Sequence, residues 1–379
     1  MSKIDDTKYI DFSDCKVTQQ TYGGVNGDKI GIIYNNERYL LKFPSIAKLN
    51  DNMHYTNGNI SEYIGCHIFN DLGIKAQETL LGTYTTGKGI VKNVVACKDF
   101  TDLSHGIVLQ DFASLKNNVI DSVRHGYGTD LDDILDTIDQ QRHINADELR
   151  EHFWNTFVID EFIANPDRHN GNWGFLYNST RDENIIAPIY DCGSSLLPQA
   201  DQTAMETMLK HKPQLNIRIY ERPTSAITVN GKRINYNAFN EYGLNKYPEY
   251  RRAMLRIEER LSPTRIAAII DNTPNLSELQ NIFYKTLLSE RKEILLDQSL
   301  LKTMVNVSEI GAYNTDRIPG AISYTHNKKE QVKQTSLKQS YELSSLDDEI
   351  ESALAEQDHH HSEPEQNKDV FDRDEDEIR

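Results

Sequence analysis

Residues 165–176, "NPDRHNGNWGFL", crowd an acid, a guanidinium, an imidazole and three side-chain amides into one short polar loop. The preceding segment, 147–164, places apolar residues on one face at helical spacing, and Pro166 ends that helix. The following segments, "WGFLYN" and "IIAPIYD", predict two strands joined by the polar turn "STRDEN". We therefore expect the loop to lie between a helix and a hairpin, with Asp191 near the same end of the hairpin.

The spacing of Asp167 and Asn172 matches one half of a site for phosphoryl transfer. Asn172 follows Asp167 by five residues, which is the D-x-x-x-x-N interval of a kinase catalytic loop. In such a loop the acid accepts the proton of a substrate hydroxyl and the amide oxygen binds Mg²⁺. Asp191 follows an apolar strand and precedes Cys192 and Gly193, where a second metal-binding carboxylate is expected. We therefore expect Asp167 to act on the hydroxyl, and Asn172 and Asp191 to bind the metal.

A hairpin in the first 100 residues supplies a candidate cation. "KIGIIYNNERYLLKF" alternates apolar residues on both sides of Asn35–Asn36, which predicts a strand, a tight turn and a second strand. Lys42 ends the second strand and is expected to contact the phosphates of ATP. Glu62 comes 20 residues later, in the first turn of a helix predicted over Ser61–Gly73, and is expected to form an ion pair with Lys42.

A glycine-rich segment, "TYGGVNGDK", precedes this hairpin. Its backbone amides can approach a phosphate closely because glycine has no Cβ, although glycines in hairpin turns are common and the segment alone is a weak signal. The residues expected to line the nucleotide here are Gly23, Gly24, Asn26 and Gly27.

Each candidate also has an ordinary structural explanation. Asp167 can cap a turn, Asn172 can serve as a turn residue, and Lys42 can lie on a solvated strand face. His169 is expected either to shape the catalytic loop by a hydrogen bond or to contact phosphate, and a purely structural role fits it equally well. Taken together, in this order and at these intervals, the residues predict an enzyme that transfers phosphate from ATP with Mg²⁺.

Composition divides the chain into three parts. Strand patterns dominate residues 1–100 and helical patterns dominate residues 101–305, so we expect an α+β fold with a β-rich N-lobe and an α-rich C-lobe. Residues 306–379 lose the apolar periodicity and are expected to form a linker and a disordered acidic tail. Residues 341–379 hold 15 acidic and 3 basic side chains, so most of the net charge of −17 lies there. The first 340 residues carry a net charge of only −5, which argues against a nucleic-acid-binding surface spread over the fold. The acidic tail is the region where a protein partner would bind.

The remaining composition limits the class of protein. No run approaches the roughly 20 apolar residues of a membrane span, and the N-terminus lacks the apolar core of a signal peptide. Four cysteines lie far apart without a C-x-x-C pair, which favours reduced thiols over disulfides or zinc. We expect a cytoplasmic protein, or one delivered into a host cell by a route that needs no signal peptide.

The chain contains "YGGVNGDKI", "SEYIGCHIFNDLGIKAQETLLGTY", "PDRHNGNWGFL" and "IAPIYDCGSSLLPQAD". These four segments resemble the HipA-like kinases, most closely their CtkA-like proinflammatory branch, over about residues 10–300. The resemblance implies a bilobal protein-kinase-like fold and a bacterial toxin or effector that phosphorylates serine and threonine, itself included, with ATP and Mg²⁺. It supports the catalytic and metal-binding roles given above. It also implies a hinge beside adenine at residues 96–100, with the cofactor bound by Ala96, Cys97, Lys98 and Asp99.

The chain departs from related kinases in ways that affect regulation. It has D-R-H where ordinary kinases have H-R-D, and "DCG" where they have D-F-G, so control by a moving phenylalanine is not assumed. The glycine-rich segment also lacks the serine whose phosphorylation silences HipA members of the family, so that form of self-inhibition is not expected.

Two other functions remain open for the same residues. A small-molecule or lipid kinase would use a similar loop, and the appearance of label on a small molecule would identify it. A nucleotide-binding scaffold without turnover would need only the binding residues, but scaffolds of this kind usually lack one of the catalytic or metal-binding residues that are intact here.

Overall fold

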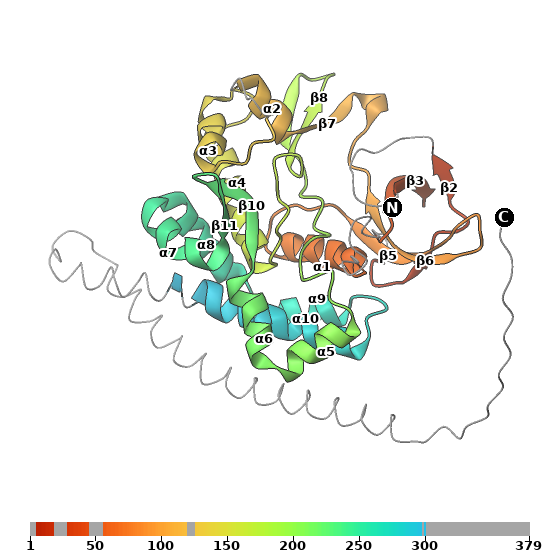
Figure 1. The fold of residues 1–379 in the computed structure, drawn as a ribbon. Helices are drawn as coiled ribbons and strands as arrows, with labels where there is room; N and C mark the ends of the chain where they lie inside the picture. Colours follow the sequence, from red (N-terminus) through yellow and green to blue (C-terminus); the bar gives the residue numbers. More distant parts are fainter. Residues whose placement is uncertain (1–4, 19–28, 45–55, 120–125, 298, 301–379) are drawn as a thin grey trace, which may run out of the picture. The chain divides into compact units, whose positions relative to one another are not determined.

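The structure of the chain is a computed structural model that describes residues 5–18, 29–44, 56–119, 126–297 and 299–300 (Figure 1). These residues belong to one compact unit, Met1–Tyr313. Within it, strands gather in the N-terminal part and helices in the C-terminal part, as predicted. The acidic tail and the four candidates of the glycine-rich segment lie outside the described residues.

A six-stranded sheet forms the N-terminal part of the fold. In spatial order its strands are β1 (Ile10–Asp11), β5 (Thr79–Thr85), β6 (Val91–Lys98), β4 (Glu37–Lys42), β3 (Lys29–Tyr34) and β2 (Lys16–Thr18). The predicted hairpin is present as β3 and β4, and Asn35 and Asn36 have φ of 48° and 63°, as a two-residue type I′ turn requires. Lys42 is the last residue of β4 and pairs with Val95 of β6. Because β4 lies between β6 and β3, Lys42 is on a central strand of the sheet.

Helix α1 (Gly58–Asp71) packs against β5 and β6 and carries Glu62. It begins three residues before the predicted start, so Glu62 lies in the second turn and not in the first. Ile64 and Ile68 lie four residues apart on one face of this helix and are fully buried. Gly73 follows the helix with φ of 81°, the left-handed conformation that glycine adopts at helix ends.

Helices dominate the second part of the described chain. They are α2 (Phe112–Val119), α3 (Leu131–Gln140), α4 (Ala146–Phe162), α5 (Gln202–Lys210), α6 (Lys212–Asn216), α7 (Tyr236–Lys246), α8 (Pro248–Arg260), α9 (Pro263–Asp271) and α10 (Glu278–Arg291). Helix α4 packs against α8, and Trp154, Phe157 and Tyr250 meet there with ring centroids 5.3 to 5.7 Å apart. This aromatic cluster anchors the C-terminal half of α4, which leads into residues 165–176, the predicted catalytic loop.

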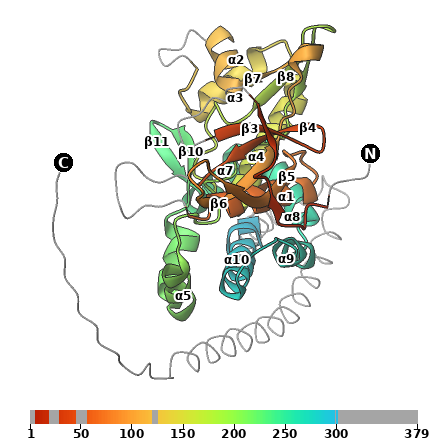
Figure 2. The ribbon, with the colours of Figure 1, turned by 90° about the vertical axis from the view of Figure 1, so that its right-hand side faces the viewer.

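Helix α10 lies between α5 and α9 (Figure 2). The helix predicted from residue 275 to about residue 301 begins three residues later than expected, and its predicted end lies outside the described residues. Ser277 and Gln280 form a capping box, which starts the helix at Glu278, and a π-helical segment, η3 (Lys292–Asp297), follows it. None of the helices among the described residues is long and apolar enough to cross a membrane.

Two small sheets flank the catalytic loop. One has the order β7 (Ile107–Asp111), β8 (Gly174–Asn178), β9 (Glu183–Ile186), and the other pairs β10 (Thr224–Val229) with β11 (Lys232–Asn235). The strand predicted over 185–191 ends at Ile186, because Pro188 has no amide to donate. Ile189 instead exchanges backbone hydrogen bonds of 2.8 and 2.9 Å with the segment before β5, through Gln77 and Lys75. This pairing brings the residues that follow it against α1.

Candidate active site

Lys42, Glu62 and Asp191 converge from three separate elements. Lys42 Nζ lies 3.1 Å from Glu62 Oε1 and 3.0 Å from Asp191 Oδ1. The backbone N–H of Asp191 donates to the same Glu62 oxygen at 3.0 Å. The Glu62 side chain is 1% exposed and the Asp191 side chain 40%, so this cluster is closed at α1 and open to solvent at Asp191.

The charges in this cluster stabilise one another. Burial by itself lowers the pKa of Lys42, but the carboxylates of Asp191 and Glu62 outweigh burial and hold that pKa well above its ordinary value. Lys42 is in turn the main reason that the pKa of Asp191 falls to about 2, against the opposing effect of burial. Near neutral pH Lys42 is therefore a cation and Asp191 a carboxylate, the charge states that phosphate and a divalent metal require.

Small residues allow the segment after Asp191 to lie against α1. Asp191 itself has φ of 62°, a left-handed conformation that costs free energy for a residue other than glycine. A Cβ on Gly193 would lie 3.1 Å from Glu62 Oε2, and a Cβ on Gly65 would lie 2.7 Å from the Cβ of Cys192. This close packing accounts for the glycine of "DCG" and places the fully buried Cys192 against α1.

Replacing Lys42 tests the cluster. We expect Lys42→Met to lower kcat about 10- to 100-fold, because the phosphates lose a positive charge. It should also lower the melting temperature, because the buried Glu62 carboxylate loses its cation. The double variant Lys42→Met with Glu62→Gln should recover the melting temperature but not the activity. Near wild-type activity in Lys42→Met would show that this lysine does not act on phosphate.

The catalytic loop leaves α4 through a left-handed turn. Ala164 has φ of 53°, and the Asn165 N–H donates to the Asp160 carbonyl at 2.8 Å. The Asp167 N–H then donates to Asn165 Oδ1 at 3.1 Å. Asn172 Nδ2 donates to the Asp167 carbonyl at 2.8 Å, which closes the five-residue interval into a compact loop. Because this nitrogen faces the carbonyl, the Asn172 side-chain oxygen faces away from it.

Asp167 and His169 lie next to each other on this loop. Among the described residues, no hydrogen bond uses the Asp167 carboxylate. Burial raises the pKa of Asp167, while the charge of His169 lowers it and that of Asp191 raises it. His169 Nδ1 accepts a hydrogen bond from the Gly171 N–H at 3.1 Å. The structure thus gives His169 a loop-shaping hydrogen bond, and its role in catalysis stays a prediction.

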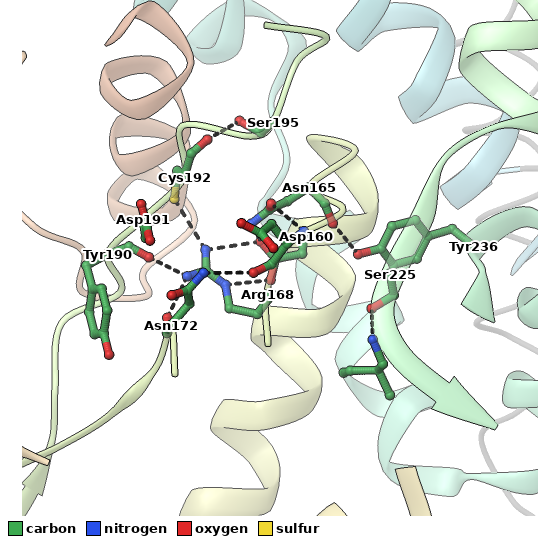
Figure 3. Close-up of polar contacts among 12 residues, drawn as sticks. Asp160, Asn165, Arg168, Asn172, Tyr190, Asp191, Cys192, Ser195, Ser225 and Tyr236 are labelled. Atoms are coloured by element: carbon green, nitrogen blue, oxygen red, sulfur yellow. Dashed lines mark hydrogen bonds and ion pairs between the residues drawn. The ribbon is translucent and has the colours of Figure 1, made fainter. Parts of the chain in front are cut away.

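Arg168 joins three segments beneath the loop (Figure 3). Its side chain is 4% exposed, and its guanidinium pairs with Asp160 near the end of α4, with 2.9 Å between Nε and Oδ2. It also donates to the carbonyls of Asn172, at 2.8 Å, and of Tyr190, and its Nη2 lies 3.4 Å from Cys192 Sγ. One buried side chain therefore connects α4, the catalytic loop and the segment that carries the expected metal ligand.

We expect Arg168→Lys to lower kcat about tenfold or more, because a lysine can pair with Asp160 but cannot also reach both carbonyls with the planar fork of arginine. The melting temperature should fall as well. Arg265→Lys, which changes an arginine in an exposed ion pair with Asp71, is the matched control and should alter neither quantity measurably. Unchanged kcat in Arg168→Lys would show that the loop keeps its geometry without this connection.

The residues predicted to bind adenine lie at the end of β6. Ala96 and Cys97 are fully buried within the sheet. Lys98 Nζ pairs with Glu37 at 2.9 Å, and Asp99 lies 3.6 Å from Arg38 Nε, so these two side chains stabilise the sheet. Their role at the nucleotide stays a prediction.

The described residues contain no group of three or more His, Cys, Asp or Glu side chains that could hold a metal ion. A metal at Asn172 and Asp191 would therefore need further oxygen atoms, which the phosphates of a nucleotide and water can supply. The four cysteines, expected to be reduced, are free thiols.

A family model, a relative of known function and a solved structure all relate this chain to the HipA-like kinases. Residues 21–273 match the family described as the HipA-like C-terminal domain. The serine/threonine-protein kinase CtkA of Helicobacter pylori is 47% identical over 290 residues, which cover 76% of this chain and 86% of that relative. The crystal structure of a Helicobacter pylori proinflammatory kinase CtkA superimposes with a TM-score of 0.71 at 46% identity, and covers 78% of this chain and 97% of the other.

Proposed function

Because this chain belongs to the HipA-like C-terminal domain family, we infer that it is a serine/threonine protein kinase that uses ATP and Mg²⁺. The observation that carries this inference is the convergence of Lys42, Glu62 and Asp191 within 3.1 Å. A cation held by a buried acid, next to an ionised and accessible carboxylate, is what the phosphates of ATP and their metal ion require. The likeness to a kinase over most of the chain supports the same reaction.

The side chains fit a divalent metal and the phosphates of ATP. Asp191 is an accessible carboxylate and Asn172 offers an amide oxygen, and both are hard donors of the kind that Mg²⁺ prefers. Bound Mg²⁺ would neutralise the charge on the β- and γ-phosphates. Lys42, oriented by Glu62, adds positive charge to the same phosphates.

Asp167 is the residue that we assign to the substrate hydroxyl. Its carboxylate makes no hydrogen bond within the described part of the chain, and it lies close enough to His169 and Asp191 for their charges to change its pKa. From this position it orients a serine or threonine hydroxyl toward the γ-phosphate. It accepts the hydroxyl proton as the new O–P bond forms and the bond to the leaving phosphate oxygen breaks.

Incubation of the purified chain with γ-labelled ATP and Mg²⁺, followed by mapping of the phosphorylated residues, tests this function. We expect label on serine or threonine, in the chain itself and in an added protein, and no label after chelation of Mg²⁺. Label on a small molecule or lipid alone would support the alternative kinase. ATP binding without any transfer would support the nucleotide-binding scaffold.

A further inference from the structure

The β10–β11 hairpin brings an exposed arginine to the catalytic loop. From β11, Arg233 Nε donates to the Ser225 carbonyl at 2.8 Å, and its Nη2 donates to the carbonyl of Pro166. Pro166 directly precedes Asp167 in the chain. Two backbone carbonyls therefore fix this guanidinium next to the residue that we assign to the substrate hydroxyl.

Arg233 keeps most of its capacity to form hydrogen bonds. A guanidinium has five N–H groups, and the contacts to the two carbonyls use only two of them. No carboxylate lies within ion-pair distance of Arg233 in the described ranges. Asp130, which pairs with Thr228 of the same hairpin, uses its carboxylate to cap α3. An exposed guanidinium that is held rigidly and has free donors is well suited to bind a carboxylate of another molecule.

Two arginines contact the catalytic loop. Arg168 contacts the backbone of the catalytic loop at Asn172, and Arg233 contacts it at Pro166, next to Asp167. Arg168 is buried and paired with Asp160, whereas Arg233 is exposed. Of these two arginines, only Arg233 can therefore contact a substrate.

The rings of Tyr127 and His169 both lie close to Gly171 of the catalytic loop. Tyr127 is 56% exposed. A Cβ on Gly171 would lie 3.2 Å from the Tyr127 ring and 3.1 Å from the His169 ring, so both rings are close to the backbone of this glycine. The exposed Tyr127 ring therefore offers a contact surface for a peptide near His169, two residues after Asp167 in the chain.

We propose that Arg233 makes this kinase select serines and threonines that have acidic residues a few positions away in the substrate. The proposal rests on the kinase function inferred above. Arg233 is hydrogen-bonded to Pro166, the residue before Asp167. An extended peptide advances about 3.3 Å per residue. A substrate carboxylate about two or three positions from the hydroxyl can therefore reach Arg233 while the hydroxyl lies at Asp167. The substrate class is therefore an acidic peptide.

The chain's own sequence supplies a suitable probe. Residues 341–350, "YELSSLDDEI", place three acids, Asp347, Asp348 and Glu349, two to four positions after Ser345. This segment lies outside the described residues, and we use only its sequence, as a synthetic peptide added to the full chain.

The experiment measures kcat/KM for three peptides: this acidic one, a neutral one with Asp347→Asn, Asp348→Asn and Glu349→Gln, and a basic one with lysine at all three positions. We expect the wild-type kinase to prefer the acidic peptide over the neutral one by about tenfold at low salt, and by less at high salt. Arg233→Gln should bring this ratio close to one, and Arg233→Glu should favour the basic peptide. Lys232→Gln is the matched control, because neighbouring side chains on a strand point to opposite faces, and it should keep the wild-type ratio.

The ratio separates recognition from a structural effect. If Arg233 only supports the loop, Arg233→Gln will lower the rates for all three peptides equally and leave the ratio unchanged, which overturns the proposal. Phosphorylation without an acidic preference in the wild type also overturns it, while the kinase function stands. Failure to transfer phosphate to any peptide and to the chain itself would instead contradict the kinase function.

Discussion

Asp167→Asn is expected to lower kcat by about 10²- to 10⁴-fold, because the substrate hydroxyl loses both its proton acceptor and the group that orients it. The fold should remain, since no hydrogen bond among the described residues uses this carboxylate and asparagine has the same shape. ATP with Mg²⁺ should still raise the melting temperature about as much as in the wild type, because Asp167 is not assigned to the metal.

A thermal-shift titration beside the activity assay decides this assignment. The measurement is the rise in melting temperature with ATP at fixed Mg²⁺, in the wild type and in Asp167→Asn. A variant that is inactive but keeps the shift agrees with a residue that meets only the hydroxyl. Loss of the shift would mean that Asp167 holds the metal.

Asp191→Asn is expected to abolish both phosphorylation and the Mg²⁺-dependent part of the stabilisation by ATP. The loss of a charged metal ligand should lower kcat by about 10²-fold or more. Asparagine tolerates the left-handed backbone seen at φ of 62°, so the variant should fold. The ion pair with Lys42 is lost, but Lys42 keeps the buried Glu62 as its partner.

A titration of Mg²⁺ at constant ATP, with the melting temperature as the readout, tests this prediction in the wild type and in the variant. In the wild type the stabilisation should rise with Mg²⁺, whereas in Asp191→Asn it should stay nearly flat. A variant that keeps the full Mg²⁺-dependent shift would contradict the role of Asp191 as metal ligand. If Asp191→Asn kept the shift and Asp167→Asn lost it, the two assignments would have to be exchanged.

Local patterns in the sequence were sufficient for the parts of the fold that depend on neighbouring residues. The Asn35–Asn36 turn and Gly73 at the end of α1 were predicted because their backbone conformations are set within a few residues. The interval from Asp167 to Asn172 is equally local, and one hydrogen bond of 2.8 Å closes it. Element ends were less predictable, and Pro188 was overlooked as the reason that β9 stops at Ile186.

The sequence alone led to the acids, the amide and the lysine that we propose for phosphoryl transfer, because their residue types and order along the chain match that chemistry. Only the tertiary structure showed that Lys42 and Asp191, which are 149 residues apart, meet at 3.0 Å. It likewise revealed Arg168 as a buried connection and Arg233 as a neighbour of Pro166. In a sequence an arginine is most simply taken for a solvated surface residue, since burial of its charge is favourable only beside a partner that the distant chain supplies. Which arginine is buried and which faces a substrate is therefore decided by long-range packing.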